Sequence, residues 1–209
     1  MLVSVRMIQK TAGFLLPYIS IGIGIFMFHN AWLAILSYHI GILSIVILSK
    51  KKYPLARLFK SRNYNAPVIM GLTGVCGGLL VFLLWPYLAV PGQIADYARG
   101  IGLTEKTWPF FVVYFILANA LFEEYFWRGY LDNGSIRITL NDVVFSGYHI
   151  AVLFGGIGTP WLLAIFLILT AAAWAWRQIN RQNEGLLPSV ACHVAADISV
   201  ILVAYSRIR

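Results

Sequence analysis

Acidic and basic side chains stand together inside an otherwise apolar stretch, LFEEYFWRGYL, at residues 121–131. Glu123 and Glu124 are adjacent there, and Arg128 follows four residues after the second glutamate. The whole chain has only 8 Asp and Glu residues, so two neighbours in one apolar run need a reason. A carboxylate in such surroundings is a candidate general base, because it can accept a proton from water.

Two further apolar stretches carry histidines. FSGYHI contains His149, and CHVAAD contains His193 and, four residues later, Asp197. Imidazole groups donate and accept protons near neutral pH, and they also bind metal ions. One carboxylate and two imidazoles are therefore able to activate water, provided that the fold brings the three stretches together.

Helical spacing predicts different roles for the two glutamates. Residues four apart lie on one face of a helix, so Glu124 can form an ion pair with Arg128. Glu123 points about 100° away from Glu124 around the helix axis. We therefore expect Glu124 and Arg128 to support the structure, while Glu123 faces a cavity.

The elements that carry these residues are expected to be membrane-spanning helices. The chain of 209 residues is 60% hydrophobic and only 11% charged. A soluble domain has about 25% charged residues. A spanning helix needs about 20 mostly apolar residues. The composition therefore predicts an all-α polytopic membrane protein and leaves no room for a separate soluble domain.

We expect about seven transmembrane helices, with six to eight as the range, around a polar cavity biased toward the cytoplasm. Residues 1–209 are expected to form a single transmembrane domain, with the motif-bearing helices in about 107–206. The predicted helices are 11–29, 31–49, 66–90, 107–131, 140–155, 159–177 and 186–206.

Charges in the connections predict the orientation. The 91–106 connection has as many acids as bases and is expected outside, whereas the 132–139 and 178–185 connections are expected inside. The C-terminal arginines break this pattern, so either the odd number of spans is right or one helix is re-entrant. The positive-inside rule places the 50–62 connection in the cytoplasm, because it has no acid and carries Lys50, Lys51, Lys52, Arg57, Lys60 and Arg62.

The three polar sets are predicted to lie at similar depth. At about 1.5 Å rise per residue, Glu123, His149 and His193 lie roughly 12, 14 and 10 Å from the cytoplasmic ends of their helices. This agreement favours one inward-facing, water-filled pocket over three unrelated structural contacts. His29 and His39 belong to none of these three polar sets and are interpreted as structural.

The two cysteines, Cys76 and Cys192, form no CxxC pair. Each falls inside a predicted span, so neither a disulfide framework nor a zinc knuckle is expected.

The polar stretches match, in order, the motifs of a known family. EEYFWR matches EExxxR, FSGYH matches FxxxH, and HVAAD matches HxxxN/D. The chain thereby resembles the CPBP family, also called Abi or type II CAAX-endopeptidase-like intramembrane proteases, over about residues 119–200. Each motif is weak alone, and all three in order are a strong signal.

The resemblance implies proteolysis within the membrane. Glu123 and His149 would activate a water molecule, and His193 with Asp197 would stabilise the oxyanion. The second glutamate and its arginine would hold the site together. Family members process prenylated CAAX proteins, peptide precursors or C-terminal anchor segments, and nothing in this sequence indicates prenyl specificity.

Position 197 departs from the better-understood prenyl-protease members, which carry Asn there. An ionised Asp197 cannot donate a hydrogen bond to an oxyanion. It could instead be protonated, orient His193, or help to hold a metal. Many family members are described as metalloproteases, and a glutamate with two histidines is a feasible zinc set. Because there is no HExxH motif, we expect a metal-free glutamate mechanism without a cofactor, with zinc as the alternative.

Two other classes of function compete with a protease. One is a non-catalytic scaffold or bacteriocin-immunity-type protein of the same fold, although all the motif residues are intact here. The other is a small transporter, which usually shows paired halves, and no internal repeat is found.

The expected partners are a membrane-associated protein or peptide substrate and the lipid bilayer. Nucleic acid is not expected despite the net charge of +8, because the cations cluster beside the predicted spans. The expected location is the plasma (inner) membrane of a prokaryote.

Overall fold

The structure, a computed structural model, describes residues 2–49, 53–88 and 92–208, and every regular element in these ranges is helical. The all-α fold class is therefore confirmed. Four of the basic residues used to predict the orientation lie outside the described residues: Lys50, Lys51, Lys52 and Arg209.

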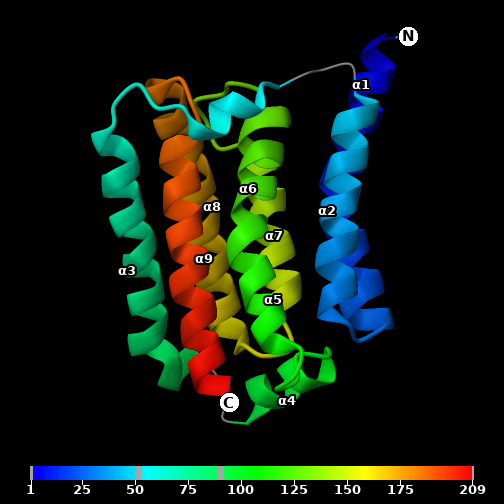
Figure 1. Cartoon of the computed structure of the whole chain (residues 1–209). Coiled ribbons are helices and arrows are strands. Elements are labelled where there is room, and N and C mark those ends of the chain that lie inside the picture. Colours follow the sequence, from blue (N-terminus) through cyan, green and yellow to red (C-terminus); the bar gives the residue numbers. More distant parts are fainter. Residues whose placement is uncertain (1, 50–52, 89–91, 209) are drawn as a thin grey trace.

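The first two long helices form a hairpin. The chain reverses at His29, whose φ of 49° is left-handed, and Asn30 caps the second helix by accepting a hydrogen bond from the Leu33 N–H at 2.9 Å. The break between the predicted helices 11–29 and 31–49 is confirmed, whereas the first helix begins well before residue 11. The hairpin consists of α1 (Leu2–Ile21), the π-helical turn η1 (Gly22–Met27) and α2 (Ala31–Leu48) (Figure 1).

α3 (Asn65–Leu88) packs directly against α9 (Leu187–Ile208). Two glycines of α3 allow the close approach. A Cβ atom on Gly74 would lie 2.2 Å from the Cys192 carbonyl oxygen, and one on Gly78 would lie 2.2 Å from Ser199 Cβ. Small residues four apart let membrane helices come together closely. This contact positions α9, which carries the third motif.

Two short helices lie in the connections. η2 (Leu55–Phe59) is a 3-10 turn in the cationic connection, and α4 (Gln93–Gly100) lies in the segment predicted to be a plain loop. That prediction is wrong for α4 because its charged side chains face outward while Ala98 and Tyr97 pack inward. The Tyr97 hydroxyl donates a hydrogen bond to the Val152 carbonyl at 2.6 Å. Burial raises the pKa of Tyr97 to about 12, so this donor stays protonated at neutral pH.

The helix that carries both glutamates is built from four pieces. Two of them are π-helical turns, a conformation found frequently at functional sites. The bounds predicted from the sequence are right within one residue at each end, but the hydrogen-bond pattern changes on either side of Glu123. The pieces are α5 (Trp108–Tyr114), η3 (Phe115–Asn119), α6 (Ala120–Glu123) and η4 (Glu124–Tyr130).

α7 (Leu140–Leu153) and α8 (Thr159–Asn183) complete the bundle. α8 continues past its predicted end at residue 177, so Arg181 lies on the helix and only residues 184–186 lead to α9. Three polar side chains in this part of α8 are buried against neighbouring segments: Arg177, Asn180 and Asn183.

Six helices of the described residues are long and apolar enough to cross a membrane. α7 is the exception, because its 14 residues make it roughly 21 Å long. The seven main helical segments nevertheless alternate in direction. The start of α1 therefore lies at the same end as residues 53–62 and the 132–139 connection, and the end of α9 lies at the other end, beside α4 (Figure 1).

The outside of the bundle is apolar. Leu79 and Leu83 on α3 are 56% and 61% exposed, and Leu163 on α8 is 63% exposed. Such side chains are suited to contact with lipid, whereas the polar side chains of the motifs point into the bundle.

Candidate active site

The imidazole of His193 lies between the two adjacent glutamates. Its Nδ1 is 2.9 Å from Glu124 Oε1, and its Nε2 is 3.5 Å from Glu123 Oε2. Nδ1 carries a proton, because an ionised carboxylate can only accept. All three residues are buried. The first and third motifs, far apart in the sequence, therefore meet as expected.

Glu123 also contacts the second motif, through Tyr148. The Tyr148 hydroxyl donates a hydrogen bond to Glu123 Oε1, and it lies 3.3 Å from His149 Nε2. The other ring nitrogen of His149, Nδ1, is 2.8 Å from the Phe145 carbonyl oxygen. Nδ1 therefore donates, and the neutral ring has its lone pair on Nε2. Because a tyrosine hydroxyl has one proton, this lone pair remains able to accept from another donor.

Glu124 is paired with Arg128, as the spacing predicted. Arg128 Nη1 lies 3.3 Å from Glu124 Oε1, with both side chains buried. The guanidinium also lies over the rings of Phe145 and Trp176, at 3.8 and 4.8 Å from their centroids. Arg128 is thus fixed by an ion pair and by two aromatic faces, which holds Glu124 against His193.

Asp197 extends the cluster along α9. Its Oδ1 is 3.6 Å from His193 Nε2, and its Oδ2 accepts a hydrogen bond from Asn119 Nδ2 at 3.1 Å. Asn119 is the last residue of η3, four residues before Glu123. The hydrogen bond from Asn119 uses the Asp197 carboxylate as an acceptor.

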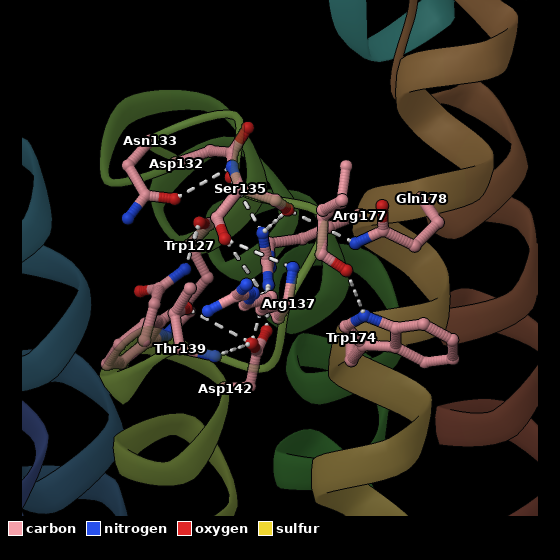
Figure 2. A network of polar contacts seen from close by, with 12 residues as sticks. Trp127, Asp132, Asn133, Ser135, Arg137, Thr139, Asp142, Trp174, Arg177 and Gln178 are labelled. Atoms are coloured by element: carbon pink, nitrogen blue, oxygen red, sulfur yellow. Dashed lines mark hydrogen bonds and ion pairs between the residues drawn. The ribbon is translucent and has the colours of Figure 1, made fainter.

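A second polar network holds the end of the bundle from which α7 starts (Figure 2). Arg177 Nε and Nη2 lie 2.7 and 2.6 Å from the two carboxylate oxygens of Asp142. Arg177 also donates to the carbonyls of Ser135 and Arg137. Asp142 Oδ2 accepts from the Thr139 N–H at 2.8 Å and so caps α7. The network fixes the start of the helix that carries the second motif.

The prediction from sequence did not include Tyr148, Asn119 or the Asp142–Arg177 pair. Two signals in the sequence were available. Tyr148 is a polar residue next to a motif histidine, and Asn119 is a polar residue four positions before a motif glutamate. Asp142 and Arg177 lie 35 residues apart on different helices. No local pattern could have paired them.

The cluster is closed to solvent at its centre, where Glu123 is 1% exposed. The expected polar cavity opens beside it, at Arg128, rather than onto Glu123 itself. Among the described residues, no group of three or more His, Cys, Asp or Glu side chains is arranged to hold a metal ion. The imidazole Nδ1 atoms of His149 and His193 are already engaged with the chain's own acceptors.

Residues 105–199 match the family described as type II CAAX prenyl endopeptidase Rce1-like. This part of the chain is thus similar to the Rce1-like family. The match includes every residue of the cluster, from Asn119 to Asp197, and the resemblance found in the motifs is confirmed. No curated protein and no solved structure matches the chain.

The family is described as one of endopeptidases, and the match supports a protease-type enzyme at the level of the family. Together with six helices able to span a membrane, the match makes the chain an integral membrane protein. α1, α2 and α3 lie outside the matched region.

Proposed function

We propose that the chain is an intramembrane endopeptidase that hydrolyses a peptide bond near the membrane surface, with Glu123 and His149 activating water. The observation that carries this proposal is the state of the Glu123 carboxylate. One oxygen is held by Tyr148. The other, Oε2, is buried and has no hydrogen-bond partner among the described residues. His193 Nε2 lies 3.5 Å away from this oxygen, beyond a good hydrogen bond. A carboxylate that is held at one oxygen and accepts no hydrogen bond at the other is suited to take a proton from water.

In the proposed reaction, Glu123 Oε2 accepts one proton of the water, and His149 Nε2 accepts a hydrogen bond from the other. The water oxygen forms a bond to the carbonyl carbon, and the carbonyl oxygen becomes an oxyanion. His193, protonated at both ring nitrogens in this proposal, donates from its Nε2–H to this oxyanion. The C–N bond then breaks while Glu123 gives its proton to the leaving nitrogen, which yields a carboxylic acid and an amine.

In this proposal Glu124 and Arg128 have supporting roles. Glu124 holds the Nδ1–H of His193, so that the opposite nitrogen points toward the reacting carbonyl. Asp197 orients His193 and is itself held by Asn119. The substrate is proposed to be a membrane-associated protein or peptide, in the plasma membrane of a prokaryote.

Purified protein in detergent tests the proposal with a peptide mixture whose products are read by mass spectrometry. Glu123→Gln keeps the size of the side chain and removes the base, so cleavage should fall by about 10²–10⁴-fold without loss of folded protein. Glu105→Gln, an exposed glutamate in the α4–α5 connection, is the matched control and should cleave like wild type.

Equal cleavage by Glu123→Gln and wild type would refute the glutamate base. Loss of wild-type cleavage on adding a zinc chelator, with recovery on adding zinc, would replace the metal-free mechanism by a metal-dependent one. A wild-type protein that cleaves nothing but retains a membrane partner would instead favour the non-catalytic scaffold.

A further inference from the structure

A cavity of about 460 Å³ lies where residues 53–62 and the 132–139 connection meet the turn between α8 and α9. It is walled by these connections and by the ends of helices, not by the lipid-facing sides of the spans. Four arginines line it, from three elements: Arg57 of η2, Arg128 of η4, and Arg177 and Arg181 of α8.

The acids of this cavity have cations of their own. Asp132 pairs with Arg177 at 3.3 Å. Glu184 pairs at 3.5 Å with Arg62, which is not part of the cavity wall. Neither carboxylate therefore forms an ion pair with Arg57 or Arg181.

Two arginines at the rim have no carboxylate partner in the part of the chain that the structure describes. Arg57 lies over the Tyr53 ring, 5.8 Å from its centroid. Arg181 donates to the Gly134 carbonyl at 3.3 Å. Both side chains are exposed at the mouth and are able to turn toward a ligand.

The inner side of the cavity is formed in part by Arg128. Its Nη1 and Nη2 are buried and have no hydrogen-bond acceptor among the described residues, although the guanidinium is ion-paired with Glu124. A guanidinium group binds a carboxylate through two parallel N–H donors. The cavity thus combines a buried cation that lacks acceptors with two unpaired cations at its mouth.

We propose that this cavity binds a carboxylate of the peptide substrate, and that Arg57, Arg128 and Arg181 bind its oxygens. The identity of the ligand rests on the proposed function. Arg128 follows Glu123 by five residues, which is about 7 Å along the helix. At about 3.3 Å per residue of extended peptide, the recognised acid lies two or three residues from the cleaved bond.

Cleavage of a mixed peptide library tests this subsite. The double variant Arg57→Gln/Arg181→Gln should lower kcat/KM about tenfold, through KM, for peptides with a carboxylate two or three residues from the cleaved bond. Peptides without such an acid should be cleaved as by wild type. Arg137→Gln is the matched control, because it removes one exposed cation at the same end without altering the cavity wall. A double variant that keeps the wild-type ratio of acidic to neutral cleavages overturns the subsite.

A binding measurement separates the subsite from the reaction. In the Glu123→Gln protein, inorganic phosphate at constant ionic strength should raise the thermal midpoint by about 2–4 °C when its concentration is several times Kd. Adding Arg57→Gln/Arg181→Gln should abolish the rise. If the wild-type protein cleaves no peptide but this pattern is found, the anion site is supported while the proposed protease function fails. The absence of any rise overturns the site.

The remaining source of an anion at this end is a lipid headgroup. The same proteins are therefore compared in nanodiscs of phosphatidylcholine with and without phosphatidylglycerol. A midpoint that rises only with phosphatidylglycerol, together with no preference for acidic peptides, would assign the cavity to lipid and overturn its assignment to the substrate. A preference for acidic peptides that is equal in both nanodiscs supports the proposal.

Discussion

Glu123 and Glu124 are neighbours in the chain, yet their environments differ. Glu123 meets the Tyr148 hydroxyl on α7, whereas Glu124 meets the guanidinium of Arg128 on its own helix. The same imidazole, that of His193, contacts one carboxylate through each of its nitrogens. We therefore expect substitution of a supporting residue to lower the stability of the fold, and substitution of a proposed catalytic residue to lower the rate of cleavage.

Arg128→Ala is expected to destabilise the protein. Removing the guanidinium leaves Glu124 as a buried charge without its main partner, at a cost of about 3–5 kcal/mol. Each kcal/mol lowers the thermal midpoint by roughly 2–4 °C in a chain of this size. Arg128→Lys, which keeps a cation but loses the planar contact with Phe145 and Trp176, should lie between wild type and Arg128→Ala. A midpoint unchanged in Arg128→Ala would show that Glu124 does not depend on this ion pair.

The variant Asp197→Asn tests whether the side chain at this position acts as a hydrogen-bond acceptor or as a donor to the oxyanion. In the structure the carboxylate accepts from Asn119 and lies beside His193 Nε2. We therefore expect the amide to orient these groups less well and kcat to fall by about 10–100-fold, as when an outer partner of a functional group is removed. If Asp197 instead donates to the oxyanion as a neutral acid, the variant should keep its activity and lose any decline at high pH. The pH profiles of kcat for both proteins decide between these roles.

The sequence allowed the ionisable members of the site to be predicted, but not its hydroxyl and amide members. A charge inside an apolar span stands out because of its cost, so Glu123, His149 and His193 were found without coordinates. Tyr148 and Asn119 occur in spans without such a penalty, and only the packing of α7 and α9 against the glutamate helix reveals their contacts. His193 itself was predicted, but its contact with both glutamates was not, because sequence spacing does not specify contacts between helices.

Packing at the level of helices depends on contacts that periodicity does not specify. α3 meets α9 through Gly74 and Gly78, where added side chains would overlap the neighbouring helix. An apolar pattern predicts that both helices exist, but it does not say which face of one meets which face of the other. The π-helical turns η3 and η4 were missed likewise, because their apolar pattern is compatible with an ordinary α-helix.

Valine substitutions in α3 test the glycine contact. Gly74→Val should lower both the thermal midpoint and activity, because its Cβ would lie 2.2 Å from a backbone oxygen of α9 and would displace the helix that carries His193. Gly77→Val is the matched control, since nothing lies within 4 Å of a Cβ at that position. Similar midpoints for the two variants would mean that α3 and α9 need not be in close contact.

At the scale of the whole molecule, the alternation of helices places most of the described cationic connections at one end (Figure 1). The C-terminal segment lies at the opposite end, where Arg207 stacks over Phe82 at 4.4 Å. The described residues form seven main helical segments that alternate in direction, and six of them are long and apolar enough to cross a membrane. The choice between an odd number of spans and a re-entrant helix stays a prediction that depends on α7. The first half of the chain was predicted only as apolar spans, because it carries none of the motifs.

Cysteine labelling in intact cells tests the orientation. In a protein with Cys76 and Cys192 replaced by serine, Asn63→Cys lies at the end that we expect in the cytoplasm and should resist a membrane-impermeant reagent. Glu105→Cys lies at the other end, is also exposed, and should react. Labelling of Asn63→Cys from outside would reverse the predicted orientation.

The short length of α7 has a consequence for the surrounding lipid. At roughly 21 Å, this helix falls short of the hydrocarbon core of about 30 Å that its neighbours can span. Such hydrophobic mismatch is relieved when the bilayer thins locally or when polar groups reach inward to the interface. A thinned annulus beside α7 would bring aqueous solvent nearer to the depth of His149, and activity should accordingly decline as phospholipid acyl chains are lengthened. The thickness of the host membrane then becomes a determinant of turnover, separate from the sequence of any peptide.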